Sequence, residues 1–249
     1  MVANKTIQSP EDSRDWTAET IFSELNLPKT LDLRSKMKAP RNQKSRGTCA
    51  AFTGAAMKEY QEKTDVSYDN YMSPDFIYFH RETKPGSGMH GRNVMKILKE
   101  YGCAQEYMLP YAKSDRTDIS KKVYTDAKNF KILSYARVYT IEGLKKALYK
   151  NGPCYISFPT YKHRPEFWRA EKDEQRIGGH AVCCVGYTKD SFILRNSWGK
   201  DWNRTGHVLY PFVEWGKHWE VWSAIDDQSA VPDPPPKLQL CLNKMCNLI

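Results

Sequence analysis

Several features common in other protein classes are missing from this sequence. No run of apolar residues approaches the roughly 18 that a membrane-spanning helix requires. No internal repeat is apparent, and the first six residues lack the apolar core of a secretory signal. We therefore expect no membrane partner and a place inside a cell, in a reducing compartment, or inside a viral particle.

The sequence also gives little indication of disulfide bonds or of a metal site. The seven cysteines are odd in number, and 249 residues far exceed the length of small scaffolds that disulfides hold together. Cys183 and Cys184 are adjacent in an expected strand, so their side chains should point to opposite faces. Cys241 and Cys246 could pair or bind a metal, but no other ligands with a convincing spacing accompany them. We expect no metal and no organic cofactor.

Basic residues outnumber acidic ones, and the chain carries a net charge of +9 at pH 7. Such an excess can attract acidic substrates, nucleic acid or an anionic surface. The lysines and arginines are scattered and no nucleic-acid motif accompanies them, so we favour a solvated basic surface and no specific nucleic-acid partner. Residues 1–30 differ from the rest, since they hold three basic and five acidic residues.

Three short segments supply the groups of a cysteine acyl-transfer site. Gln43 lies six residues before Cys49, which opens an alanine-rich run that favours a helix. His180 lies far downstream, sixteen residues before Asn196. A thiol becomes nucleophilic when a helix N-terminus and an imidazolium lower its pKa, and the imidazole then carries the proton. An amide can orient that imidazole, while the Gln43 side chain and the Cys49 N–H would face the oxyanion.

Each of these residues also has a structural explanation when it is taken alone. A single cysteine is usually a small buried hydrophobe, and a single histidine is usually a packing residue. All four at these intervals favour catalysis. We also expect Thr48 to cap the helix and Trp198 to cover the histidine–asparagine bond, although Trp198 is equally explained as a core residue.

At these residues the sequence resembles the papain-like cysteine peptidases. The two intervals fit that family, as does the Asn-Ser-Trp-Gly run at 196–199 followed by Trp202, and the resemblance covers residues 31–225. The family signature C-G-[SA]-C-[WY] reads Arg-Gly-Thr-Cys-Ala at residues 46–50. Arg46 replaces a disulfide cysteine and Ala50 replaces an aromatic residue. No catalytic group is lost, and the departures indicate a divergent branch, viral or bacterial.

The resemblance implies an α+β fold of two lobes, with the active-site cleft between them. Residues of about 41–125 would form a helical lobe that carries Cys49, and residues of about 126–225 a β-barrel-like lobe that carries His180 and Asn196. In the first lobe, helices are expected over about 49–63, from Pro74 after a Ser73 cap, and through 94–101 before Gly102. In the second, we expect a helix over 141–150 and strands over 154–158, 181–187, 191–195 and 207–212. Residues 226–249 would be a proline-rich tail.

The resemblance also implies where a peptide substrate would lie. Gly88 would pair with the substrate backbone, although a flexible loop explains residues 86–88 almost as well. Gly179 and Ser157 would border the pocket for the residue two before the cleaved bond. Trp198 and Trp202 are included among the substrate-binding residues, Trp202 because it matches a family position on the leaving-group side.

We therefore expect a monomeric endopeptidase that hydrolyses polypeptides through a thioester acyl-enzyme. An exopeptidase, an isopeptidase or another Cys–His acyl transferase would use the same four residues with a different groove or acceptor. A catalytically quiet binding or structural protein would keep only the fold, and the complete set of four residues argues against it.

Residues 1–30 form an N-terminal extension whose role is open. Their acidic excess would draw them onto the basic body, where they would act as a short inhibitory pro-segment. Their apolar residues would anchor them in the substrate groove: Ile21, Phe22, Leu25 and Leu27. An extension that packs on the surface, or stays disordered, without inhibiting is the alternative.

Overall fold

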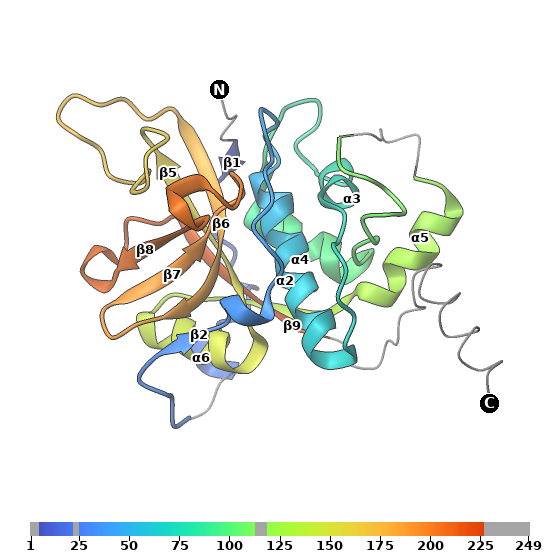
Figure 1. The fold of residues 1–249 in the computed structure, drawn as a ribbon, viewed down its shortest axis with the longest axis horizontal. Coiled ribbons are helices and arrows are strands. Elements are labelled where there is room, and N and C mark those ends of the chain that lie inside the picture. The colour runs from blue at the N-terminus through green and yellow to red at the C-terminus, as the bar shows by residue number, and fades with distance from the viewer. Residues whose placement is uncertain (1–4, 22–24, 113–118, 227–249) are drawn as a thin grey trace.

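Helices gather on one side of the molecule and a β-sheet on the other (Figure 1). The structure is a computed structural model that describes residues 5–21, 25–112 and 119–226. The helical side holds α2 (Cys49–Val66), α3 (Pro74–Phe79), α4 (Gly91–Glu100) and α5 (Lys121–Ala127). Two helices lie beside the sheet, α1 (Ala18–Ile21) and α6 (Ile141–Asn151). Short 3₁₀ turns connect the elements: η1 (Arg34–Lys36), η3 (Lys128–Phe130), η4 (Trp202–Arg204) and η5 (Phe212–Glu214).

Seven strands form one antiparallel sheet in the order β4-β9-β5-β6-β7-β8, with β2 beside β6. Their bounds are β2 (Leu31–Asp32), β4 (Ile132–Arg137), β5 (Cys154–Thr160), β6 (Gly178–Tyr187), β7 (Ser191–Arg195), β8 (His207–Pro211) and β9 (Glu220–Asp226). Within the described ranges, β4 and β8 stay unpaired with each other, so the sheet of this α+β fold does not close into a barrel. A second, parallel sheet joins β1 (Thr6–Ile7) to β3 (Met89–His90).

Helix α2 runs between the sheet on one side and helices α3 and α4 on the other. Every residue from 49 to 62 is buried, because small side chains along the helix let its neighbours approach closely. A Cβ atom on Gly54 would lie 2.6 Å from Val94 Cγ1 in α4. The buried charges on this helix are paired, as with Lys58, which bonds Glu62 and Asp226 at 2.6 Å each. A helix buried on all sides holds its first residue at the junction of the two halves.

The expected elements agree with the structure at most of their boundaries. The Ser73 hydroxyl caps α3 by accepting from Phe76 N at 3.2 Å, as expected. Gly102 ends α4 with a left-handed φ of 81°. The cap expected from Thr48 is wrong, because its hydroxyl bonds the Tyr111 hydroxyl instead. Cys183 and Cys184 face different core clusters on the two sides of β6, which confirms that prediction.

Other elements were missed or shortened. Helix α1 spans Ala18–Ile21, and residues 25–27 are not helical. Strands β4 and β9 and helix α5 were not expected. The expected proline-rich tail, including Cys241 and Cys246, lies beyond Asp226 and outside the described residues. In the portion that is described, no helix is long and apolar enough to cross a membrane.

Thermal stability should not depend on reductant. The five described cysteines are buried free thiols: Cys49, Cys103, Cys154, Cys183 and Cys184. The midpoint of thermal unfolding, followed by circular dichroism, should therefore agree within about 2 °C with and without reductant. The control is the Cys241→Ala/Cys246→Ala double variant. A large fall in reductant that persists in this variant would contradict the prediction.

Candidate active site

Cys49 begins α2, and its thiol is buried where the helix N-terminus meets β6. The backbone of Ala50 and of Ala181 contacts the sulfur. A helix N-terminus favours a thiolate, but burial is the larger effect here and raises the pKa of the Cys49 thiol. In the arrangement that the structure describes, the sulfur is therefore kept neutral.

His180 in β6 and Asn196 after β7 form a fixed pair. His180 Nε2 lies 2.7 Å from Asn196 Oδ1, which also accepts from Ser197 N at 2.7 Å. The Ser197 donor identifies this amide atom as the oxygen, so Nε2 carries the proton and Nδ1 holds the lone pair. Nδ1 has no hydrogen-bond partner among the described residues. This is the ring atom that can accept a proton.

The surroundings of His180 are apolar and aromatic. Trp198 stacks on the imidazole with ring centres 4.5 Å apart and planes 24° apart, on the residue whose bond to Asn196 it was expected to cover. Trp202 meets Trp198 edge-on at 5.2 Å. Burial lowers the pKa of His180 to about 3, and the Asn196 hydrogen bond opposes this only in part.

Gln43 is buried in the loop that precedes α2, and hydrogen bonds orient both its side chain and its backbone. Its Oε1 accepts from Ser197 Oγ at 2.6 Å, and its Nε2 donates to Arg46 O at 2.8 Å. Its backbone N–H donates to Ser197 O at 2.8 Å. The amide of Gln43 is thus tied to the segment that carries Asn196, so the four predicted residues belong to one connected site.

The N-terminal extension lies against the thiol, through residues 5 and 6 rather than through the expected apolar anchors. The backbone of Lys5 and the side chain of Thr6 contact Cys49. Lys5 bridges Gly179 in β6, and β1 pairs in parallel with β3. Thr6 Oγ1 donates to Met89 O at 3.2 Å and lies 3.0 Å from the Tyr155 hydroxyl. The N-terminal segment, residues 5–21, therefore begins between the helical side and the sheet.

Two glycines allow the N-terminal segment to approach β6 and the residues before β3 closely. A Cβ atom on Gly88 would lie 1.6 Å from Lys5 O, and one on Gly179 would lie 2.4 Å from Thr6 O. Gly88 has a φ of 97°, so a side chain would also be strained there. The two glycines predicted to bind substrate thus face one extended backbone from opposite sides. Ser157 is buried in β5, opposite Ala181.

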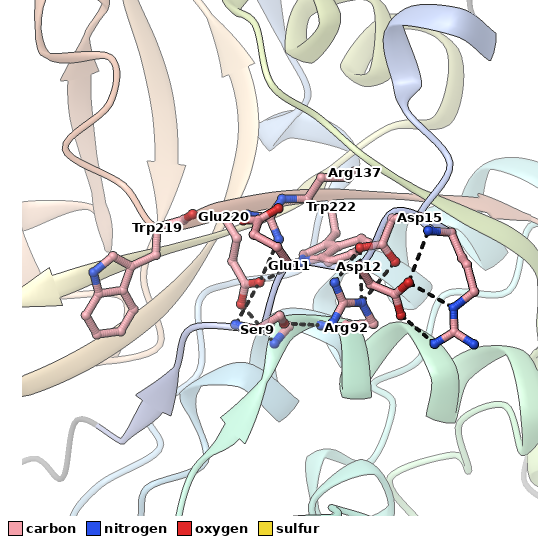
Figure 2. A network of polar contacts seen from close by, with 11 residues as sticks. Ser9, Glu11, Asp12, Asp15, Arg92, Arg137, Trp219, Glu220 and Trp222 are labelled. Atoms are coloured by element: carbon pink, nitrogen blue, oxygen red, sulfur yellow. Dashed lines mark hydrogen bonds and ion pairs between the residues drawn. The ribbon is translucent and has the colours of Figure 1, made fainter.

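Farther along, the segment is held by Glu220 at the start of β9 (Figure 2). Ser9 N donates to Glu220 Oε2 at 3.2 Å. The same carboxylate also accepts from the body of the protein, from Gly91 N at 3.0 Å, Arg137 Nη1 at 3.2 Å and Trp222 Nε1 at 3.1 Å. Glu220 would keep three of these four donors if the segment left.

A second attachment joins Asp15 to Arg92 in α4 (Figure 2). The Asp15 carboxylate accepts from Arg92 Nε at 2.9 Å and pairs with Nη2, and both side chains are about nine-tenths buried. Asp12 instead pairs with Arg14 within the segment, and that arginine is exposed. The Asp15–Arg92 pair therefore connects the segment to the helical half, while the Asp12–Arg14 pair does not.

These contacts correct the expected anchors. Leu25 is only partly buried and lies against α6, near Glu142 and Lys146, rather than beside Cys49. Leu27 is also only partly buried, and Phe22 lies outside the described residues. The acidic excess of residues 1–30 was a useful signal, since Asp15 makes the buried ion pair. No group of three or more His, Cys, Asp or Glu side chains placed to hold a metal occurs in the described ranges.

Comparisons with known proteins agree with this geometry. The family model for papain family cysteine proteases matches residues 27–213. A peptidase C1-like protein of Acanthamoeba polyphaga mimivirus, itself uncharacterized, is 28% identical over 254 residues, covering 83% of this chain and 80% of that protein. Cysteine proteinase 1 of Entamoeba histolytica is 30% identical over 217 residues, covering 79% of this chain and 67% of that protein.

Solved structures of cysteine proteases are also similar to this chain. Xylellain, a cysteine protease from Xylella fastidiosa, is similar with a TM-score of 0.77 and 26% identity, over 90% of this chain and 96% of that one. A procathepsin B from Trypanosoma congolense, 19% identical with a TM-score of 0.70, has the same fold. The chain belongs to the papain family of cysteine proteases and is a hydrolase.

Proposed function

We propose that the protein is an endopeptidase in which Cys49 is the nucleophile and His180 is the base. The observation that carries this is the His180–Asn196 pair, which leaves Nδ1 with a lone pair on the strand whose Ala181 contacts the thiol. His180 would take the thiol proton, and the thiolate would attack the peptide carbonyl. The protonated imidazole would then donate to the leaving amine, which leaves a thioester on Cys49.

The second half of the reaction reverses these roles. His180 would take a proton from water as the water oxygen attacks the thioester. The bond from the carbonyl carbon to sulfur would then break, which releases the acid, and the imidazolium would return its proton to the Cys49 sulfur. In both halves, negative charge develops on the carbonyl oxygen, and the Gln43 amide and the Cys49 N–H are the donors we assign to it. Asn196 would hold the imidazole orientation, and Trp198 would keep water from that hydrogen bond.

The substrate is proposed to be an extended polypeptide. An extended backbone already lies beside Cys49, bridging Gly179 on one side and pairing with β3 on the other. We propose Gly88, Gly179, Ser157, Trp198 and Trp202 as the residues that line the substrate path. We also propose that residues 31–225 form the peptidase domain.

Removing the thiol tests the nucleophile. Cys49→Ser should lower kcat by about 10⁴-fold or more, because a hydroxyl is a far weaker nucleophile beside the same imidazole. The measurements are hydrolysis of fluorogenic peptides and labelling by a peptidyl epoxide. Cys103→Ala is the matched control, since it removes a buried thiol elsewhere, and it should keep turnover. Wild-type labelling of Cys49→Ser would refute the assignment.

Removing the amide of Gln43 tests the oxyanion site. Gln43→Ala should lower kcat by about 10²–10³-fold with a smaller effect on KM, because the donor acts mainly on the developing charge. Gln61→Ala is the matched control, since Gln61 is also buried and donates to Ala224 O. An unchanged kcat for Gln43→Ala would remove Gln43 from the oxyanion site.

We further propose that residues 5–21 keep the enzyme latent. They cover the thiol, and burial favours both the neutral thiol and the neutral imidazole. Displacement would admit water, which favours the thiolate–imidazolium pair. The contact between Ser9 and Glu220 is reversible in principle, because the Glu220 carboxylate keeps its other donors when Ser9 leaves.

Weakening the attachment should activate the full chain. Asp15→Asn removes the charge that meets Arg92, and breaking such a buried pair typically costs about 3–5 kcal/mol. We expect peptide hydrolysis and alkylation of Cys49 to rise at least tenfold. Asp12→Asn is the matched control, because its pair is exposed and internal to the segment, and it should change little. A folded Asp15→Asn chain that is no more active would exclude latency through this segment.

A further inference from the structure

We propose that Tyr111 is a positioning residue for the reaction, and that the Arg46–Asp75 ion pair holds it in place. The two together would do for the loop at residues 43–48 what a disulfide does in relatives with a cysteine at position 46. The inference rests on the proposed peptidase activity, since that loop carries the oxyanion donor Gln43 and leads into Cys49.

The Tyr111 hydroxyl joins both ends of the loop. It donates to Gln43 O at 2.8 Å and lies 2.8 Å from Thr48 Oγ1, so that Thr48 is its donor. Burial raises the pKa of Tyr111, which keeps the hydroxyl protonated and able to donate at neutral pH. On the other side, Ser197 binds Gln43 through both its backbone and its side chain. Gln43 is thus held from both halves of the molecule.

Tyr111 is itself fixed by packing and by one backbone contact. Its ring meets Phe52 of α2 edge-on, with centres 4.7 Å apart. Its N–H donates to Glu106 Oε1 at 2.8 Å. The Arg46 guanidinium lies over the ring, 4.8 Å from its centre. The Tyr111 side chain therefore has little conformational freedom, and its hydroxyl stays in contact with the loop.

Arg46 attaches the loop to α3 by charge rather than by sulfur. Its Nη1 lies 2.8 Å and 3.0 Å from the two Asp75 oxygens, and Asp75 is fully buried. Ala112 N donates to the same carboxylate at 2.7 Å, which ties in the residue after Tyr111. A partly buried ion pair with a further backbone donor is unaffected by reductant, whereas a disulfide at this place would be lost.

Loss of the hydroxyl has a specific expected consequence. The buried Gln43 carbonyl would lose its Tyr111 donor, and the loop would be free to shift towards another partner. Such a shift moves the oxyanion donor, but it leaves the His180–Asn196 pair and the start of α2 in place. Turnover should therefore suffer more than substrate binding, and more than the reactivity of the thiol.

The experiment compares Tyr111→Phe with its parent in the full chain, in the Asp15→Asn background. We expect kcat to fall 10–100-fold, KM to change less than twofold, and the rate of Cys49 alkylation by iodoacetamide to change less than twofold. Alkylation requires the thiolate but no oxyanion donor, so it separates the two effects. Tyr60→Phe removes a buried hydroxyl from α2 that bonds Thr64, and it should leave all three values unchanged.

A second background makes the test specific. When Gln43 is already alanine, Tyr111→Phe should cost less than twofold in kcat, because the group it positions is absent. An unchanged kcat in the parent background would overturn the proposal. So would a full loss on top of Gln43→Ala, or a parallel loss of alkylation.

Two controls keep the outcomes separate. If Tyr111→Phe does not fold, Thr48→Val replaces it, since it removes the donor that orients the same hydroxyl. It should lower kcat about threefold or more without changing alkylation, and an unchanged kcat would overturn the proposal. If the Asp15→Asn parent is alkylated at Cys49 but hydrolyses no peptide, the peptidase proposal fails and this one fails with it. If the parent is active and Tyr111→Phe is equally active, only the positioning role fails.

Discussion

The burial of α2 between the sheet and helices α3 and α4 is the constraint on which the rest of the structure depends. Its small residues allow neighbours to pack on every side. Because the helix is buried, an unpaired charge on it would lower the stability of the fold, and its buried charges are paired. Because the helix is fixed along its length, its first residue, Cys49, is held against β6 within reach of the groups on that strand. The candidate residues come from both halves of the molecule, and the packing of α2 against β6 brings Cys49 to the strand that carries His180.

The same burial creates a conflict between a stable resting state and a reactive one. A covered thiol and a covered imidazole both favour their neutral forms, whereas the chemistry needs the thiolate and the imidazolium. In the proposed latent state, the N-terminal segment keeps both groups covered and neutral. It places a backbone beside the sulfur, and its buried ion pair lies farther along, between Asp15 and Arg92.

Most of the long elements and the four candidate catalytic residues were predictable from sequence, because local patterns specify them. A capped start after Ser73, a stop at Gly102 and buried runs such as 191–195 are local signals. The two-residue strand β1 is different, because it exists only through its pairing with β3 more than 80 residues away. Its contact residue Thr6 has no periodic pattern around it. The expected leucine anchors failed for the same reason: hydrophobicity alone does not say which surface a segment will meet.

Two aspartate–arginine pairs in this molecule differ in how firmly the surrounding structure holds their partners together. Asp75 and Arg46 both belong to the folded body, and a backbone donor from Ala112 adds a further contact, so separating them would require α3 and the loop to move apart. Asp15 belongs to the N-terminal segment, which is also attached through strand β1, through Ser9 and through three hydrogen bonds that Glu19 accepts from residues 139 and 140. In the proposed latent state these contacts hold Asp15 against Arg92, and activation requires them to be broken while Arg92 stays in α4. The strength of an ion pair therefore does not decide whether it is permanent. What decides it is how much other structure must be broken when the two charges part.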